Sequence, residues 1–263
     1  MHNNTVNEFL KRNNINEEEI KRQISTKNLS IHDYNDIFYN YGKYYNYIIN
    51  KVSIGDIIGY NYEWRDIPSD LFESLDKLFD ANGSNYLCRS VPNLYKTSEE
   101  MLSSDSFENE IIDLINLSDN NDVLVIGDNG IHRYTVLKIL YLKELVENRK
   151  TLKELKDKYT VLARVSTIDR LKTYSNFIVS NLLGLRLNLE KIGYFQSTGN
   201  CYIIGKDFNK LYTDQELREY IKVLIKNNVD FVSKYSNNTD FMNFIENELN
   251  INIENASLKK LLT

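Results

Sequence analysis

Apolar and polar residues are arranged along this chain of 263 residues in patterns that predict both strands and helices. Residues 51–58 alternate between the two classes, as in a strand that ends at a glycine turn. Residues 123–126 form a short, continuous apolar run, typical of a strand buried on both faces. Residues 131–145 repeat apolar positions at helical spacing, and 160–165 predict another strand. Strand, helix and strand in one segment predict a mixed α/β sheet.

The first 50 residues predict helices instead. Asn16 stands before three glutamates, which is a favourable start for a helix. Ser30 followed by Asp33 is a second pattern of this kind. Beyond it, aromatic and aliphatic residues recur at helical spacing as far as Ile48. We expect this tyrosine-rich stripe to pack on the main domain, with a ligand-binding surface as the alternative.

Capping residues and apolar spacing locate further elements. They are a helix capped by Ser69 over 71–79, a capping box at Thr97 and Glu100, a helix over 107–115, a capping box at Thr151 and Glu154, a helical stretch beyond 170, a hairpin over 194–204, a capping box at Thr213 and Glu216, and one helix over 231–249.

Composition is that of a globular protein, with 42% hydrophobic and 26% charged residues, so wholesale disorder is not expected. The two cysteines, Cys88 and Cys201, provide neither a disulfide framework nor zinc spacing. The apolar runs are shorter than a membrane span needs, and the N-terminus lacks the pattern of a signal peptide. We therefore expect a cytoplasmic protein with no membrane partner.

Charge is unevenly distributed, although the net value is only −5 (32 basic against 37 acidic residues). Residues 97–130 contain 9 acidic and no basic side chains, whereas 131–172 contain 11 basic and 5 acidic ones. The negative total argues against a dedicated nucleic-acid binder, so we expect weak or no binding to nucleic acid. The basic stretch is either a solvated surface or one that attracts phosphates. Its densest part consists of Arg149, Lys150, Lys153, Lys156 and Lys158.

The connection after the apolar run at 123–126 has the pattern of an anion site. Gly127 and Gly130 let the backbone approach a ligand closely, and a helix begins directly afterwards with its amides and dipole directed at the turn. In the first helical turn, Arg133 can donate two hydrogen bonds to a phosphate, and His132 can donate one or take part in proton transfer. The alternative is an ordinary strand-to-helix connection.

The six residues from Gly130 to Thr135, GIHRYT, resemble the Gly-x-His-Arg-Tyr signature of the ParB/sulfiredoxin-like superfamily. The strand pattern Val-x-Ile-x-x-Ile at 52–57 is similar to the start of that domain. The resemblance covers about 51–170. It implies an α/β (α+β) fold with a ParB/sulfiredoxin-like mixed sheet at 51–170, a helical N-terminal extension at 1–50 and a C-terminal α+β region at 171–263.

The branches of that superfamily differ at particular residues. Sulfiredoxins have a cysteine before the His-Arg pair, where this chain has Ile131, so that activity is excluded. Chromosome-partition ParB proteins carry Gly-Glu-Arg-Arg and a helix-turn-helix domain, and 171–263 predicts no such domain. The motif looks closest to the free-serine kinase branch. This resemblance implies a phosphotransferase that uses ATP or ADP (CTP is possible) and Mg²⁺ on a small hydroxylated metabolite. A non-catalytic ParB-like protein that binds nucleotide or DNA, or a ParB-like nuclease, is the alternative.

The resemblance also implies roles for individual residues. Glu63, in the loop after the first strand, matches the catalytic base, although an ion pair with Arg65 is equally compatible with the sequence. The family has Asp-Gly directly before the x-His-Arg segment, whereas this chain has Asn129 there and Asp128 one residue earlier. We expect catalytic roles for Glu63, Asp128 and His132, with Asp128 also a metal ligand. The expected phosphate-binding residues are Gly127, Asn129, Gly130, His132, Arg133 and Thr135.

Overall fold

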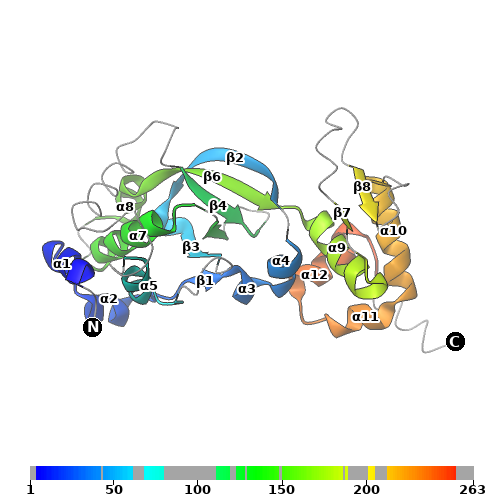
Figure 1. Cartoon of the computed structure of the whole chain (residues 1–263), viewed down its shortest axis with the longest axis horizontal. Helices are drawn as coiled ribbons and strands as arrows, with labels where there is room; N and C mark the ends of the chain where they lie inside the picture. The colour runs from blue at the N-terminus through cyan, green and yellow to red at the C-terminus, as the bar shows by residue number, and fades with distance from the viewer. Residues whose placement is uncertain are drawn as a thin grey trace. The chain divides into compact units, whose positions relative to one another are not determined.

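The computed structural model describes residues 4–42, 44–61, 68–79, 111–118, 123–127, 129–147, 150–185, 187–188, 201–204 and 212–252. The chain divides into two compact units (Figure 1). The first comprises Met1–Asp36 and Tyr44–Ile168, and the second Ile37–Lys43 and Asp169–Thr263. Helices accompany a sheet of mixed strand directions in the first unit, so the fold is of the mixed α/β class that the sequence predicts.

The first unit is built on a six-stranded sheet with the order β1-β3-β5-β4-β6-β2. The strands are β1 (Leu29–Ser30), β2 (Tyr44–Ser53), β3 (Ile57–Tyr60), β4 (Ile112–Asn116), β5 (Leu124–Ile126) and β6 (Thr160–Ile168). Strand β5 pairs in parallel with β3 and antiparallel with β4. Strand β6 pairs in parallel with β4 and antiparallel with β2. The predicted apolar strand is therefore a central strand of this sheet.

The helices of this unit are α1 (Asn4–Arg12), α2 (Glu17–Gln23), α3 (Ile31–Tyr34), η1 (Ile54–Asp56), α5 (Leu71–Leu78), α7 (Ile131–Val146) and α8 (Leu152–Lys158). Helix α7 contributes Tyr134 and Leu137 to the core, both with no exposed surface. Val6 and Phe9 of α1 are equally buried in the same cluster. Helix α1 thus contributes to the core of the first unit.

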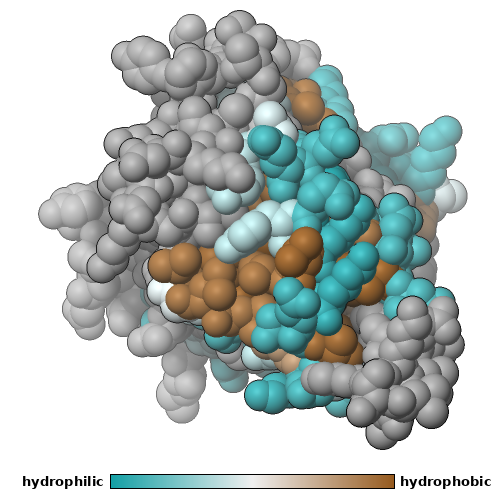
Figure 2. Space-filling model, turned by 90° about the vertical axis from the view of Figure 1, so that its right-hand side faces the viewer, coloured by the Kyte–Doolittle hydropathy of each residue, from teal (hydrophilic) through white to brown (hydrophobic). Residues whose placement is uncertain are grey.

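The second unit contains most of α4 (Asp36–Tyr41) with α9 (Arg170–Leu183), α10 (Asp214–Asn227), α11 (Val229–Lys234), α12 (Thr239–Asn243) and the π-helix η4 (Phe244–Glu248). Three short strands, β7 (Leu187–Asn188), β8 (Cys201–Ile204) and β9 (Tyr212–Thr213), form a second sheet. Aromatic rings pack together in the core of this unit. The ring centroids of Tyr174 and Phe244 are 4.7 Å apart in a tilted pair, and those of Phe177 and Phe241 are 5.4 Å apart in an edge-on pair. Apolar residues also gather on the surface viewed from the side of α10 and β8 (Figure 2).

Several local predictions are confirmed. Asn16 caps α2, and capping boxes at Thr151 and Thr213 begin α8 and α10. The strand at 123–126, the turn and the helix from Ile131 are present, as is the strand at 160–165. Within the described residues, no helix is both long and apolar enough to cross a membrane. The capping box at Thr97 and residues 194–200 of the expected hairpin lie outside the described residues.

Two predicted helices are wrong where their residues belong to strands. The stripe that runs to Ile48 divides into α3, α4 and the long strand β2, which pairs with β6. The segment 107–115 contains the start of β4, most of whose residues are buried. Its apolar residues at 111, 112, 114 and 115 are spaced as on one face of a helix, although they lie in or next to a strand. Phe38 of the tyrosine-rich stripe packs against Tyr174 of α9 within the second unit.

Other predictions need smaller corrections. The strand at 51–58 is interrupted by η1, where the Ser53 side chain accepts a hydrogen bond from the amide of Gly55. Helix α5 is capped by Asp70, one residue after the expected Ser69. The single helix at 231–249 is divided, because Asn238 caps a new helix by accepting from the amide of Phe241.

Candidate functional site

The glycine turn after β5 requires glycine at its last position. Gly130 is the N-cap residue of α7 and has φ 103°. A side chain there would be strained, and its Cβ would lie 2.9 Å from Cγ2 and 3.2 Å from Cα of Ile112. The bare backbone of Gly130 therefore lets the start of α7 lie directly against the start of β4.

Hydrogen bonds hold this turn against β4. The amide of Gly127 donates to the carbonyl of Asp113 at 2.7 Å, and the amide of Asp113 donates to the carbonyl of Asn129 at 3.0 Å. The Asn129 side chain donates to the carbonyl of Ile111 at 3.1 Å. The turn is therefore a supported, ordered segment on both sides of residue 128.

Arg133 is directed back at the same turn. Its Nη2 donates to the carbonyl of Ile111 at 3.1 Å and to Oδ1 of Asn129 at 3.3 Å. A guanidinium is permanently charged and presents its donors in a planar fork that suits phosphate. Positive charge is thus held beside the turn, but Arg133 also has a structural part in holding it.

The other two predicted ligands on α7 lie in less accessible places. The His132 ring packs edge-on against Phe79, just after α5, with 5.4 Å between ring centroids. Thr135 has no exposed surface, and its hydroxyl donates to the carbonyl of Ile131 at 2.8 Å. Because its hydroxyl is used within the helix, we leave Thr135 out of the candidate site.

The predicted base and metal ligand, Glu63 and Asp128, lie outside the described residues. The start of the Glu63 loop is nevertheless defined by its neighbours. The amide of Asn61 donates to the carbonyl of Ile126 at 2.8 Å, and Gly127 follows Ile126 directly. Parallel β3 and β5 therefore end side by side, and the loop after each strand leaves from the same edge of the sheet, where α/β proteins commonly bind ligands.

Beneath this edge lies a buried network of polar side chains that the sequence did not predict. The Tyr134 hydroxyl donates to Oδ1 of Asn28 at 2.8 Å, and Nδ2 of Asn28 donates to the Tyr60 hydroxyl at 3.1 Å. The Tyr60 hydroxyl donates to the carbonyl of Pro68 at 3.0 Å and contacts the hydroxyl of Ser74. The motif tyrosine thus anchors α7 to β3 and to the chain before β1.

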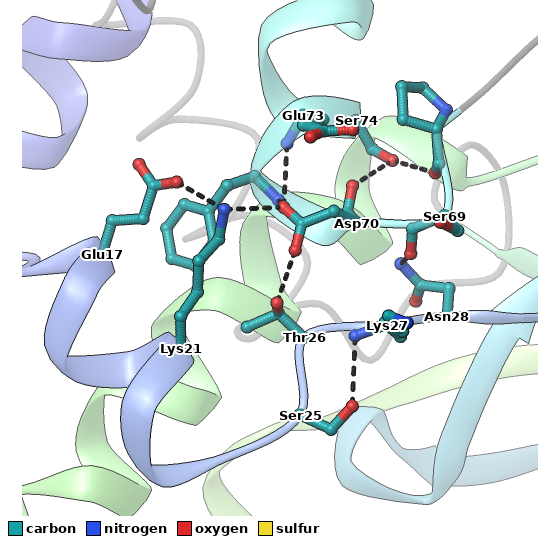
Figure 3. Close-up of polar contacts among 12 residues, drawn as sticks. Glu17, Lys21, Ser25, Thr26, Lys27, Asn28, Ser69, Asp70, Glu73 and Ser74 are labelled. Carbon is teal, nitrogen blue, oxygen red and sulfur yellow. Dashed lines mark hydrogen bonds and ion pairs between the residues drawn. The ribbon is translucent and has the colours of Figure 1, made fainter.

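Asp70 extends these contacts toward α2 (Figure 3). Its carboxylate accepts from the amides of Phe72 and Glu73 at 2.9 and 3.2 Å, and from the Thr26 hydroxyl at 2.5 Å. Nζ of Lys21 lies 3.3 Å from Oδ1 of Asp70. Burial opposes the ionisation of Asp70, but these hydrogen bonds and the charge of Lys21 outweigh it and lower the pKa of the carboxyl group.

Lys138 is a partly buried cation one turn after Tyr134. Its Nζ donates to the carbonyls of Ile54, Gly55 and Ile57 at 3.1, 3.2 and 2.7 Å, so its three N–H groups are matched to three acceptors around η1. Burial lowers the pKa of Lys138 to about 8. The sequence contained one indication of this role, a lysine on the apolar face of a helix.

A cavity of about 570 Å³ lies in a different part of the first unit. Its lining consists of Ile48, Asn50, Lys51, Val52, Ser53, Gly55, Asp56, Ile58, Leu124 and Val165. Leu124 begins β5, whereas the glycine turn follows the end of that strand. The cavity therefore borders the opposite end of β5 from the turn.

The basic stretch after α7 is largely paired with carboxylates. Lys150 lies 3.0 Å from Glu144, Lys158 contacts the same carboxylate, and Lys156 pairs with Asp56. Burial disfavours the charged form of Glu144, but hydrogen bonds from Lys158, Lys150 and Tyr159 outweigh it and lower the pKa of Glu144 to about 2. These ion pairs reduce the positive charge that this stretch presents to solvent. Weak or no binding to nucleic acid stays a prediction.

Comparison with protein-family models, curated proteins and solved structures found no match. In the part of the chain that the structure describes, no group of three or more His, Cys, Asp or Glu side chains is arranged to hold a metal ion.

Proposed function

We propose that the protein binds the phosphates of a nucleotide at the turn from Gly127 to Gly130 and transfers a phosphoryl group to a small hydroxylated molecule. The observation that carries the proposal is the bond from the Asn61 amide to the Ile126 carbonyl. It brings the start of the loop that contains Glu63 next to the start of the glycine turn, which supports a site that uses residues of both loops.

Two features of the turn favour an anion. Helix α7 directs its N-terminal amides and dipole there, and Arg133 adds a full positive charge. Phosphoryl transfer depends chiefly on positioning and on stabilisation of charge, which are the properties that such a turn supplies.

The remaining roles rest on the resemblance of the motif. Glu63 takes the proton from the acceptor hydroxyl, and His132 donates a hydrogen bond at the phosphate. A carboxylate oxygen is a ligand that Mg²⁺ prefers, so the chemistry of Asp128 suits a magnesium ion that would neutralise phosphate charge.

Binding is tested by thermal unfolding with ATP, ADP, CTP or inorganic phosphate, each with and without Mg²⁺. A ligand at about 100 times its Kd stabilises the folded state by about 2.7 kcal/mol. Arg133→Gln removes the charge but keeps a donor for the Ile111 carbonyl, and we expect it to abolish the nucleotide-dependent shift. Arg22→Gln, an exposed arginine on α2, is the control for loss of one charge. Equal shifts in the parent protein and Arg133→Gln would place the nucleotide elsewhere.

Catalysis is tested with nucleotide and a panel of small hydroxylated metabolites that includes free serine. Glu63→Gln keeps the shape of the side chain and removes the base, so we expect transfer to fall by about 10²–10⁴ while nucleotide binding persists. Nucleotide binding without transfer to any acceptor would instead support the non-catalytic binding protein.

A further inference from the structure

Strand β2 ends the six-stranded sheet with a long, apolar edge. Among the described residues it pairs with β6 alone, along one side. Tyr47, Ile48 and Ile49 follow one another in its middle and are 64%, 56% and 42% exposed. Consecutive residues of a strand point to opposite faces, so apolar surface is exposed on both faces of this edge.

The usual protections of an edge strand are sparse here. Edges are commonly blocked by charges, proline or a bulge in the strand. Between Tyr44 and Ser53 there is no proline, and Lys51 is the one charged residue. The irregularity in the pairing with β6 lies at the beginning of the strand, between Tyr44 and Asn46, and leaves the middle regular. The edge is therefore well formed for addition of another strand.

The sequence of β2 is nearly symmetric about Ile48. Residues 46–50 read Asn-Tyr-Ile-Ile-Asn. If two copies pair antiparallel about a two-fold axis at Ile48, asparagine lies opposite asparagine, Tyr47 lies opposite Ile49, and Ile48 lies opposite itself. Aromatic and β-branched residues are favourable cross-strand neighbours. A two-fold interface requires a surface of this self-complementary kind.

The position of Lys51 is compatible with this arrangement. In the antiparallel pairing about Ile48, the two Lys51 backbones are six residues apart along the strands, about 20 Å, which is beyond the screening length of about 8 Å at physiological salt. A parallel pairing in register, which would place the two lysines about 4.8 Å apart, is excluded because it would use the edge of β2 that is already paired with β6.

We infer that the β2 edge pairs with the β2 edge of a second copy of this chain, antiparallel and centred on Ile48, so that two six-stranded sheets become one continuous sheet. This inference concerns the edge of the sheet and does not depend on the proposed phosphotransferase site.

The first test is the mass of the full chain in solution, by light scattering or sedimentation, at concentrations up to about 100 µM. We expect the mass of two chains. Ile48→Lys would place two like charges opposite each other and should return the mass to that of one chain. Leu152→Lys on α8 is the matched control, because Leu152 is 55% exposed and lies away from the edge. A parent protein that stays monomeric, or a dimer that survives Ile48→Lys, would overturn the inference.

Cross-linking tests the register and does not depend on the behaviour of the lysine variant. With Cys88 and Cys201 replaced by serine, Ile48→Cys should form a disulfide-linked dimer under mild oxidation. Residues directly opposite in an antiparallel pair have Cα atoms about 4.5–5.5 Å apart, within the range of a disulfide, whereas diagonal neighbours are about 7–8 Å apart.

Ile49→Cys alone should cross-link poorly, and a mixture of Tyr47→Cys with Ile49→Cys should cross-link well. Leu152→Cys is again the control. Absence of a cross-link at position 48 in an otherwise dimeric protein would place the interface elsewhere.

Discussion

The hydroxyl of Tyr134 donates a 2.8 Å hydrogen bond to the side-chain oxygen of Asn28, a residue 106 positions earlier in the chain. Both residues are buried, with exposed fractions of 0% and 7%. The tyrosine of the Gly-x-His-Arg-Tyr segment therefore holds α7 in place from the interior, while the glycine and arginine of the same segment shape the turn at the surface.

Loss of this hydroxyl should destabilise the protein without removing the aromatic ring. Tyr134→Phe leaves Oδ1 of Asn28 buried without its donor, which costs about 1–3 kcal/mol. Urea unfolding followed by circular dichroism measures the change. Tyr220→Phe makes the same chemical change on a partly exposed residue of α10, outside β2, and should alter stability by less than about 0.5 kcal/mol. Equal effects of the two substitutions would contradict the importance of the Asn28 bond.

Gly130 and Gly184 form a matched pair of left-handed glycines. Both have positive φ, but a Cβ at Gly130 would meet Ile112 at 2.9 Å, whereas one at Gly184 would have nothing within 4 Å. Gly184→Ala should lose only the conformational preference, about 1 kcal/mol. Gly130→Ala should cost about 1–3 kcal/mol more, because it also overpacks the start of β4. The two unfolding free energies decide this, and a cost at Gly130 no larger than that at Gly184 would show that the turn relaxes easily.

Ser74 and Ser175 are both fully buried but differ in their hydrogen bonds. The Ser74 hydroxyl donates toward the carbonyls of Pro68 and Asp70, each at 2.8 Å. In the structure as described, the Ser175 hydroxyl on α9 has no hydrogen-bond partner. Ser74→Ala should therefore cost about 0.5–1.5 kcal/mol, whereas Ser175→Ala should be neutral or stabilising. Thermal unfolding of the two variants tests this, and a destabilising Ser175→Ala would reveal a bound water or ligand at α9.

Lys138 should make stability rise with pH in the alkaline range. Burial lowers its pKa from 10.5 to about 8, so between these values the unfolded chain binds more protons than the folded one. Folding is then favoured as pH rises, by at most about 3 kcal/mol from this residue. The difference in unfolding free energy between the parent and Lys138→Met should therefore grow from pH 8 toward pH 10.

Lys153→Met, on the exposed side of α8, is the control for loss of one positive charge. Lys138→Met should also lower stability at pH 7, because it leaves the carbonyls of Ile54, Gly55 and Ile57 without their donor. A difference from the parent that stays constant between pH 8 and pH 10 would show that the ammonium is not destabilised by its burial.

The elements that the sequence predicted well are those whose cause is local. Asn16, Thr151 and Thr213 cap helices through bonds to residues three positions away, and such bonds form within the segment itself. The turn before α7 is of the same kind, because a left-handed glycine and the helix after it are both encoded within a few residues. For the candidate site, the sequence therefore predicted the glycine turn that ends at Gly130 and the helix that begins directly after it.

The elements that it missed depend on distant partners. Strand β4 forms because β5 and β6 pair with it on either side, and β2 is a strand because β6 pairs with it. The contacts of Arg133 with Ile111, and of Lys138 with the carbonyls around η1, could not be predicted because their partners are distant in the sequence. No local pattern shows which distant carbonyl will face a cation.

The sequence by itself thus determined where α2, α8 and α10 begin, that a glycine turn joins a buried strand to α7, and that the chain has a mixed α/β fold. Tertiary structure alone decided that Asn28 receives the hydrogen bond of Tyr134, that Asn61 lies beside the end of β5, and that β2 is left at the edge. Helix caps and turns depend on bonds over three or four residues, whereas strand order and the partners of buried polar groups depend on which distant segments bury the most apolar surface together.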